Sequence, residues 1–403
     1  MHFKLTEQQR ALKKEFDDFF REEMKNAPAV YRYESILEAM YSTDEGWEFN
    51  KYMRQKLVEK GWYVRHWPKE YGGEASPLTD HLIFNESQAY YRAPGIDGFG
   101  VGMFGPTLML YASEEQKKRL IPPIARGEVQ YCQGWSEPNA GSDLASLKTT
   151  AIKDGEYYVV NGQKIWITAA HRADHMFILV RTDPSQKRNA GLSVFNVDMR
   201  LPGIEVRPIK YMNGVHLYNE VFFTDVKIHE SERIGPENQG WGLTRDTMNF
   251  ERSGAGAYAA VRRTLENLIM YVKTTKRHGK FLSEDPLVRQ KIASIYADLE
   301  AGRALSYKIA WLQEKGNLRF SPAAASESKV FGTELNKRVT DFAIEIMGFH
   351  GQLEHSKWAP LDGAVIEEYQ ASIASVIYAG SNEIQRNIIA WVGLGLPRLK
   401  GQG

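Results

Sequence analysis

Apolar residues at the start of the chain recur at the spacing of an α-helix. Over residues 7–24, Leu12, Phe16 and Phe19 fall three or four positions apart, on one face of a helix. Thr6 stands directly before this run, and its hydroxyl oxygen can accept a hydrogen bond from a backbone N–H of the first turn. The pattern predicts a first helix capped by Thr6.

The same period continues with interruptions to about residue 130. It predicts further helices over residues 47–60, 77–92 and 105–126. Residues 27–44 have no clear period and are expected to be irregular, and HWPKEYGG, His66 to Gly73, predicts a turn because of its proline and paired glycines. Residues 1–130 are therefore predicted to form a helical N-terminal domain.

From residue 131 to 240 the pattern changes to alternation of apolar and polar residues. Asn161-Gly162 lies between two β-rich runs, a typical sequence of a two-residue hairpin. Further strands are predicted at residues 175–182, 192–198, 204–210 and 219–228. Short, evenly spaced strands of this kind predict an antiparallel β-domain over residues 131–240.

After residue 240 the helical period returns and continues to the end. Long helices are predicted at residues 246–274, 298–315, 323–348 and 369–396. Four such helices in succession predict an antiparallel four-helix bundle over residues 241–403. The expected fold class is α+β, with an N-terminal helical domain, a central antiparallel β-domain and a C-terminal four-helix bundle.

Composition narrows the function classes. Among 403 residues, 51 basic side chains face 50 acidic ones, so nothing in the net charge draws the protein to nucleic acid or to a membrane surface. Cys132 is the single cysteine, which excludes a disulfide within the chain and favours a reducing compartment. We expect no membrane span and a cytoplasmic protein, or in a eukaryote an organellar one after removal of a transit peptide.

Two stretches place an indole beside a hydroxyl. Trp135 and Ser136 lie within YCQGWSEPNAGSD, residues 131–143, and Trp166 and Thr168 lie within KIWITAA, residues 164–170. An indole can cover a wide planar ligand while short hydroxyls and backbone N–H groups reach the polar edge of the ligand. A flavin ring has such a surface and such an edge.

The first stretch resembles the flavin signature of the acyl-CoA dehydrogenase family, whose usual wording is close to TEPGAGSD. The phrase HWPKEYGG and the order of helices, β-domain and bundle are also similar to this family. The resemblance implies FAD as cofactor, an acyl-CoA thioester as substrate and transfer of electrons to an electron-transferring flavoprotein. It implies cofactor contacts from Gln133, Trp135, Ser136, Ser142, Trp166, Thr168, Arg277, Ser381 and Glu383.

The catalytic base departs from the common family pattern. Where most members have YEGT near the C-terminus, this chain has Tyr378 followed by Ala379, whose side chain cannot take a proton although its backbone N–H can still bind the thioester oxygen. A minority of the family places the base on the first bundle helix, directly before an arginine, and this chain reads NFERSG there. The resemblance therefore makes Glu251 the leading base and Arg252 a cation on the CoA side.

A second candidate base remains open in the loop APGIDGFG. Asp97 in this loop would border the acyl pocket, and a carboxylate there would suit a cyclic acyl group rather than a straight chain. The substrate contacts expected from the resemblance are thus Ser142, Arg252 and, in this alternative, Asp97.

Three other departures concern assembly. The third bundle helix ends with Glu345 and Phe349 where the family often has Gln and Gly, and Gln370-Ala371 replaces an Arg-Asp pair. An acidic residue is unfavourable near a diphosphate. The family habit implies a homotetramer, and these differences raise a heterotetramer with an unlike chain as the alternative.

Alternative functions also stay open. The chain could be a flavin-binding subunit without catalytic activity, or a flavin oxidase or monooxygenase on the same fold. Gly100 to Gly105 satisfies G-x-G-x-x-G, but no strand precedes it, so we expect close helix packing there and no nicotinamide site. His171 and His175 lack accompanying cysteines or carboxylates, and no metal site is predicted.

Overall fold

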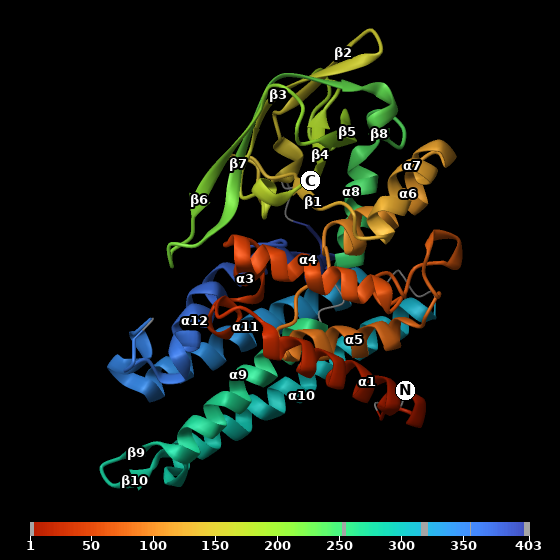
Figure 1. Cartoon of the computed structure of the whole chain (residues 1–403). Helices are drawn as coiled ribbons and strands as arrows, with labels where there is room; N and C mark the ends of the chain where they lie inside the picture. The colour runs from red at the N-terminus through yellow and green to blue at the C-terminus, as the bar shows by residue number, and fades with distance from the viewer. Residues whose placement is uncertain (1–3, 252–254, 316–320, 355, 399–403) are drawn as a thin grey trace. The chain divides into compact units, whose positions relative to one another are not determined.

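The computed structural model describes residues 4–251, 255–315, 321–354 and 356–398 (Figure 1). The side chains of residues 249–251, 255 and 321–322 also lie outside the description. The chain forms two units, and each is described by itself. The helical unit comprises Met1–Ala39, Pro77–Pro94 and Arg252–Gly403, and the sheet unit comprises Met40–Ser76 and Gly95–Glu251.

The helical unit begins with the predicted capped helix. In α1 (Glu7–Glu23), the Thr6 hydroxyl accepts a hydrogen bond from the Gln9 N–H at 3.1 Å, and the Gln9 side chain accepts one from the Thr6 N–H at 3.2 Å. This reciprocal capping box satisfies two backbone donors at once. Phe16, which is fully buried, packs edge-on against Phe84 of α5 (Leu78–Tyr90). The predicted helix and its cap are confirmed.

The expectation of an irregular segment over residues 27–44 is wrong. The structure has two short helices there, α2 (Val30–Tyr33) and α3 (Ile36–Tyr41), and α3 begins in the helical unit and ends in the sheet unit. A helix of one or two turns is too short to show a period in sequence.

The C-terminal part of the helical unit is the predicted bundle. Its helices are α9 (Ala255–Thr274), α10 (Pro286–Glu314), α11 (Ser321–Met347), α12 (Ala364–Ser375) and α13 (Asn382–Ile388). α10 begins earlier than predicted because Asp285 caps it and Pro286 occupies its first position. The single helix predicted over residues 369–396 is wrong, because a turn with left-handed backbone at Ala379 and Gly380 separates α12 from α13. A small hairpin, β9 (Lys276–Arg277) with β10 (Lys280–Phe281), joins α9 to α10, and a π-helical turn (Ile389–Gly393) follows α13.

The helices of the sheet unit are α4 (Asp44–Glu59), α6 (Gly105–Tyr111), α7 (Glu114–Ala125) and α8 (Gly240–Glu251). The single helix predicted over residues 105–126 is broken, since Ser113 caps a new helix. The G-x-G-x-x-G stretch forms a π-helical turn (Gly100–Phe104), and a Cβ at Gly105 would clash with the Trp67 ring. Gly100 and Gly105 therefore permit close packing, whereas a Cβ at Gly102 would meet no atom within 4 Å.

The sheet contains eight strands, and Figure 1 shows them at the top of the view. They are β1 (Tyr131–Gly134), β2 (Thr150–Asp154), β3 (Tyr157–Lys164), β4 (His175–Arg181), β5 (Leu192–Asp198), β6 (Ile204–Lys210), β7 (His216–His229) and β8 (Arg233–Ile234). The order is β6-β7-β3-β2-β4-β5-β8, with β1 beside β4. Most pairs are antiparallel, whereas β1 and β2 each run parallel to β4.

The hairpin predicted at Asn161-Gly162 is wrong. β3 runs straight through this dipeptide, and the turn between β2 and β3 lies at Gly155, which has φ 61°. The pairing of β3 with β7 shifts register between Val160 and Gly162, and a Cβ at Gly162 would collide with Thr149. Gly162 is therefore required by a bulge and a close approach, not by a turn.

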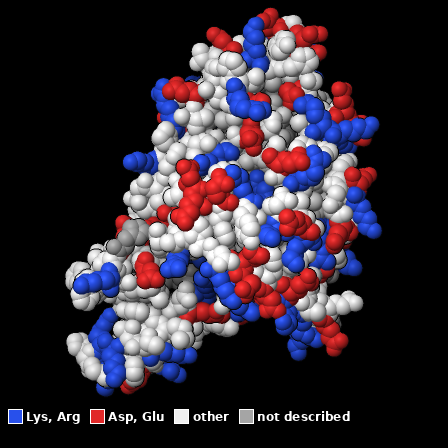
Figure 2. All heavy atoms as spheres, viewed as in Figure 1, with Lys and Arg blue, Asp and Glu red and all other residues white. Residues whose placement is uncertain are grey.

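Surface charge and hydropathy agree with the composition. Basic and acidic side chains alternate over the face that Figure 2 shows, without a large region of one sign. In the described ranges, no helix is long and apolar enough to cross a membrane. The boundaries of the three predicted domains stay a prediction, because the two units cut the chain differently.

Candidate functional site

The first candidate stretch continues from β1 into a tight turn. At the end of β1, a Cβ at Gly134 would clash with the side chain of Met176 on β4, so only glycine fits this strand contact. The chain then reverses, because the Glu137 N–H donates to the Ala140 carbonyl at 3.1 Å and the Ala140 N–H donates to the Glu137 carbonyl at 3.0 Å. Trp135 and Ser136 are thereby fixed between a strand end and a closed turn.

A buried ion pair holds this turn against the sheet. Lys164 has no exposed surface, and its Nζ donates to Glu137 Oε1 at 2.9 Å, to the Trp135 carbonyl at 3.0 Å and to the Leu179 carbonyl at 2.7 Å. Glu137 also accepts hydrogen bonds from the backbone N–H groups of Lys148 and Thr149, at 2.6 and 2.9 Å. One ammonium group thus joins the turn, β3 and β4.

The charges of this pair respond to burial and to each other. Burial lowers the pKa of Lys164 to about 8, against the opposing attraction of Glu137. Burial alone would raise the pKa of Glu137, but Lys164 and the bonded N–H groups hold it below its usual value. Both groups are therefore charged at neutral pH, and neither has a free face for chemistry. The pair is a support for the loop.

The second candidate stretch lies directly beside the first. The Ile165 N–H donates to the Ser136 carbonyl at 2.9 Å, which joins the two stretches. Ile167 is buried in the sheet core, and its N–H donates to the Asn219 carbonyl at 3.0 Å. In contrast to Ile167, the Trp166 side chain is exposed and the Thr168 side chain is half-buried, so neither is enclosed in this core. The structure therefore brings the two indole and hydroxyl pairs together.

Backbone strain and an unused donor mark the same place. Trp166 has φ 63° and Ala169 has φ 56°, left-handed values that are costly for residues with a Cβ and that often occur at ligand sites. The Trp166 side chain is 57% exposed. The Trp135 Nε1 is buried without a hydrogen-bond partner among the described residues. An open indole face and an unsatisfied donor fit a planar ligand with acceptor atoms at its edge, as FAD has.

The other residues of the sheet unit that are expected to contact the flavin lie in or beside the first stretch, and their side chains differ in exposure. Gln133 on β1 and Ser136 are half-buried, whereas Ser142 is exposed, two residues beyond the closed turn. A Cβ at the adjacent Gly141 would meet no atom within 4 Å, so the backbone there is open to an approaching group. These positions fit the resemblance, and their roles remain predictions.

Asp97, the alternative base, is fully buried in the sheet unit. Its Oδ1 accepts from the Gln130 Nε2 at 2.8 Å and from the Phe99 N–H at 3.1 Å, and its Oδ2 accepts from the Tyr131 N–H at 2.9 Å. Burial raises the pKa of Asp97, while Arg54 and these donors oppose the shift. Because both oxygens are engaged and enclosed, this environment favours a carboxylate that anchors its loop over one that removes a substrate proton.

Glu251 and Arg252, the leading base and its cation, cannot be placed. Glu251 is the last residue of α8, but its side chain lies outside the described residues, and Arg252 lies outside them altogether. Their assigned roles stay predictions.

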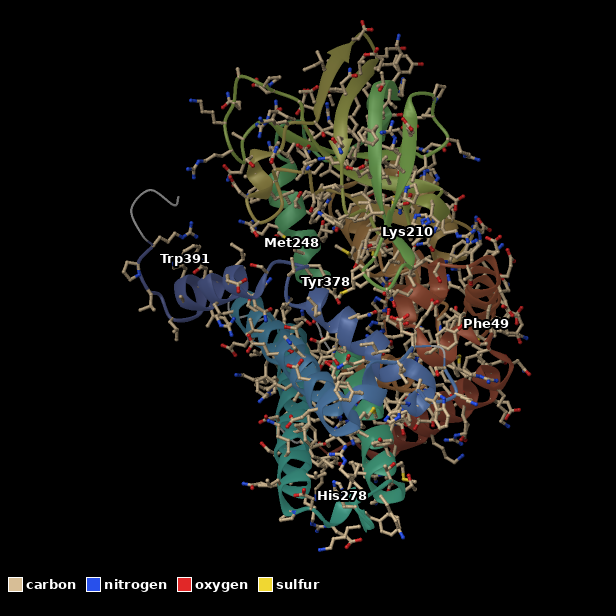
Figure 3. The ribbon with its side chains drawn as sticks, turned by 90° about the vertical axis from the view of Figure 1, so that its left-hand side faces the viewer. Phe49, Lys210, Met248, His278, Tyr378 and Trp391 are labelled. Carbon is tan, nitrogen blue, oxygen red and sulfur yellow. The ribbon has the colours of Figure 1, made fainter. Side chains whose placement is uncertain are left out.

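Ala379 lies in the connection between α12 and α13, beside the labelled Tyr378 in Figure 3. It has φ 54°, a left-handed value. Its carbonyl accepts from the Gln385 Nε2 at 2.9 Å, whereas its N–H has no hydrogen-bond partner in the described part of the chain. A donor held in a strained turn is available to a ligand.

The remaining cofactor candidates, Arg277, Ser381 and Glu383, lie near opposite ends of α11. Arg277 in β9 donates to the carbonyl of Ile346, near the end of α11. Ser381 caps α13, which bonds the start of α11 through Gln385 and Ser326 at 2.6 Å, and Glu383 lies exposed in the first turn of α13. Figure 3 shows His278, next to Arg277, at the far end of the long helices from Tyr378.

Ser326 and Ile346, the two residues of α11 that make these contacts, are twenty residues apart. At 1.5 Å per helical residue this separation is roughly 30 Å. One copy of the chain therefore does not bring Arg277 to Ser381.

Sequence reasoning missed the supporting pair and a group of arginines. Lys164 lies in a segment where apolar and polar residues alternate. Only its position on the same face as the buried apolar residues could have shown that it is buried. Arg92 lies in the turn after α5 and Arg263 lies on α9, and no short motif joins them. No group of three or more His, Cys, Asp or Glu side chains that could hold a metal occurs among the residues described.

Three family models match the chain in succession. They are the N-terminal domain of acyl-CoA dehydrogenase over residues 6–128, its middle domain over residues 132–226 and its C-terminal domain over residues 238–394. The matches cover the two candidate stretches and the whole bundle.

Named relatives agree with these models. The chain is 33% identical over 407 residues to acyl-CoA dehydrogenase FadE26 of Mycobacterium tuberculosis, with 99% of each chain covered. Its structure is similar to the ChsE4-ChsE5 complex from Mycobacterium tuberculosis, with a TM-score of 0.87, 33% identity and coverage of 99% and 100% of the two chains. It is also similar to the Tcur3481-Tcur3483 steroid ACAD, with a TM-score of 0.88, 30% identity and the same coverage.

Proposed function

The chain belongs to the acyl-CoA dehydrogenase family of FAD-dependent oxidoreductases, and from that premise we propose that it converts an acyl-CoA thioester to the enoyl-CoA. One observation carries the proposal: Trp135, Ser136, Trp166 and Thr168 lie on two joined segments of the sheet unit, with an unsatisfied indole donor and left-handed strain at the same place. This arrangement suits a bound flavin better than a bare structural turn.

Residues of both candidate stretches would hold the cofactor. Trp135 and Ser136 would bind the polar edge of the flavin, Trp166 would cover its face, and Thr168 would offer its hydroxyl as a hydrogen-bond donor. FAD, when bound, supplies the acceptor for the hydride that leaves the β-carbon. The other proposed contacts are Gln133 and Ser142 of the sheet unit and Arg277, Ser381 and Glu383 of the helical unit.

The reaction also needs a proton acceptor and a donor to the thioester oxygen. Glu251 takes the α-proton, so that the α-proton and the β-hydride leave together and a carbon–carbon double bond forms. The Ala379 N–H donates to the thioester oxygen and stabilises the negative charge that develops there as the proton leaves. This donor does not depend on a side chain, which explains how alanine can stand at a position that carries the base in other members. Arg252 binds on the CoA side.

The cyclic-substrate alternative with Asp97 as base receives no support from the surroundings of that carboxylate. Asp97 has no exposed surface and three engaged donors around it. We assign to it the role of holding the loop before β1 in place.

The proposal for the assembly follows from the neighbours and from the separation on α11. Two similar structures are complexes of two named chains. In this chain Glu345 and Phe349 depart from the family phrase, and Phe349 is 89% exposed. We propose that the chain pairs with an unlike family member in a heterotetramer, with a homotetramer as the alternative, and passes electrons to an electron-transferring flavoprotein.

Absorption spectroscopy of the purified protein tests the proposal. The account expects bound flavin, and anaerobic addition of an acyl-CoA should bleach its absorption near the long-wavelength band. A flavin that stays oxidised in excess thioesters of several chain lengths and ring types would indicate the subunit without activity. Rapid reoxidation by air with formation of hydrogen peroxide would indicate an oxidase.

A further inference from the structure

The second candidate stretch, residues 164–170, contains a bulge where it runs beside β7. Lys164 pairs with Val221 of β7, whereas the Ile167 N–H donates to the Asn219 carbonyl at 3.0 Å. Three steps along the stretch, from 164 to 167, therefore match two steps along β7, from 221 to 219, so the stretch has one extra residue. Trp166, with its left-handed φ of 63°, lies in this bulge, in a conformation that glycine usually supplies.

The side chain of Asn219 closes the bulge. Its Nδ2 donates to the Ile167 carbonyl at 3.0 Å, so the N–H and the carbonyl of Ile167 are both bonded to this one residue of β7. Asn219 has no exposed surface. The Ala169 N–H, at the next left-handed residue, donates to the Leu217 carbonyl at 2.9 Å. Asn219 thus holds the residue that lies between the expected indole and hydroxyl contacts of the flavin.

Two stacked histidines fix the direction in which the Asn219 amide points. The ring centroids of His171 and His216 are 4.0 Å apart. His216 Nε2 lies 2.8 Å from Asn219 Oδ1, and His171 Nδ1 lies 3.2 Å from Asn219 Nδ2. These contacts assign a proton to His216 Nε2, which donates, and none to His171 Nδ1, which accepts. A reversed amide would turn its oxygen toward the Ile167 carbonyl and bring two acceptors together.

His171 is kept neutral by its surroundings. Its Nε2 lies 3.0 Å from the carbonyl of Tyr41, a residue of the sheet unit, so the single proton of the ring is on Nε2. Burial lowers the pKa of His171, and the charges of His216 and Arg172 act in the same direction. The hydrogen bonds to Tyr41 and Asn219 oppose this shift. The lone pair of Nδ1 therefore remains available to the Asn219 amide at neutral pH.

We propose that Asn219 is a positioning residue for the flavin, held in its orientation by His171 and His216. The inference rests on the proposed function, because it takes Trp166 and Thr168 as flavin contacts. A left-handed residue with a Cβ persists only where its surroundings enforce that conformation. Without the Asn219 donor the bulge relaxes, and the affinity for FAD falls in proportion to the fraction of chains that keep the binding conformation.

Release of FAD from the flavin-containing protein on dilution, followed by the fluorescence of free FAD, tests the inference. Asn219→Asp keeps the shape of the side chain and the acceptor for His216, but it replaces the donor to the Ile167 carbonyl with an oxygen. We expect the dissociation constant for FAD to rise at least about tenfold, as it does when about one chain in ten keeps the binding conformation. Hydrogen–deuterium exchange over residues 165–170 should also become faster, because the Ile167 and Ala169 N–H groups lose protection.

Two changes at the half-buried His216 separate positioning from a folding defect. His216→Leu removes the donor to Asn219 Oδ1 and should weaken FAD binding less than Asn219→Asp does, because the bond to Ile167 can still form. His216→Gln supplies an N–H in place of the lost donor and should restore the affinity.

Asn196→Asp is the matched control. Asn196 is a buried amide of β5 in the same sheet, and its side chain is bonded to Tyr131 and Glu232. This change should lower the free energy of unfolding but leave the dissociation constant for FAD within about twofold, as expected for a site that shares no partner with the bulge. Equal weakening of FAD binding in Asn219→Asp and Asn196→Asp would overturn the inference. So would faster exchange over residues 165–170 without weaker FAD binding, which would show that Asn219 serves the fold alone.

A last comparison separates this inference from the proposed function. If Asn219→Asp weakens FAD binding as expected but acyl-CoA thioesters do not bleach the wild-type flavin, the positioning residue stands and the dehydrogenase proposal fails. If thioesters bleach the flavin and Asn219→Asp holds FAD as tightly as the wild type, the dehydrogenase stands and the positioning residue fails. A wild-type protein that does not bind FAD would overturn both.

Discussion

Left-handed backbone occurs at eleven non-glycine residues of the described chain, and three of them lie where chemistry is proposed. Trp166 and Ala169 belong to the second flavin stretch, and Ala379 lies in the turn that offers a free N–H. Such conformations cost of the order of 1–3 kcal/mol each and persist only where the surrounding structure enforces them. None of these residues is glycine, so the sequence alone did not reveal the strain.

The lowered pKa of the buried His66 predicts how the free energy of unfolding changes in acid. Burial lowers its pKa to about 4, below the ordinary 6.5, so between these values the unfolded chain holds a proton that the folded chain does not. Stability therefore falls as the pH is lowered through this window, by about 3 kcal/mol in total, since each pKa unit corresponds to about 1.4 kcal/mol. Urea unfolding at pH 7 and pH 4 should show a smaller loss for His66→Gln than for the wild type. His350→Gln, at an exposed histidine, should lose as much as the wild type; equal losses for all three would contradict the assignment.

The hydrogen bonds of Asp97 predict that exchanging one carboxylate oxygen for an NH2 group lowers the free energy of unfolding. The carboxylate accepts three hydrogen bonds, and Asp97→Asn would turn an NH2 group toward one or more of these donors. An unsatisfied buried donor costs about 1–3 kcal/mol, and the free energy of unfolding should fall by this amount. The matched change Asp154→Asn, on an exposed strand end, should stay within about 0.5 kcal/mol. A thermal midpoint unaltered by Asp97→Asn would argue for a carboxylate that is free to act on substrate.

At the scale of elements, the sequence predicts well where a pattern extends over several turns or strands. The capped α1, the strands β4 to β6 and the bundle follow from periodicity. The errors are local. Asn161-Gly162 has the sequence of a turn, but pairing with β7 overrides this preference, and the one-turn helix α2 has no measurable period. The flavin stretch was found from its motif, whereas Arg92 and Arg263, which are far apart in the sequence, are brought together only by the fold.

The buried pair Lys164–Glu137 predicts the stability of the flavin loop. Lys164→Met leaves Glu137 buried without its counter-charge, which costs about 3–5 kcal/mol. We expect a lower free energy of unfolding and loss of bound flavin, measured by urea titration and by flavin absorbance per chain. The double change Lys164→Met with Glu137→Gln removes both charges and should recover much of the stability. A single variant as stable as the wild type would show that the pair does not hold the loop.

At the scale of the whole molecule, the cofactor site is predicted to need more than one chain. Arg277 contacts one end of α11, whereas Ser381 caps α13, whose Gln385 contacts the other end, so the two residues would serve different FAD molecules or be completed by a partner. Sedimentation of the flavin-containing protein should show a mass of at least twice 45.9 kDa. Arg277→Met should lower flavin content, while Arg289→Met should not. A 45.9 kDa monomer with full flavin would contradict this account.

The central claim is that Glu251 removes the α-proton in a flavin-dependent dehydrogenation. Rapid mixing of an acyl-CoA with the flavin-containing protein, without oxygen, measures flavin reduction in a single turnover. Glu251→Gln should still bind flavin and thioester but reduce the flavin at least about a hundredfold more slowly, the lower bound for a lost general base. Reduction at the wild-type rate in Glu251→Gln would contradict the account and return the base to another carboxylate.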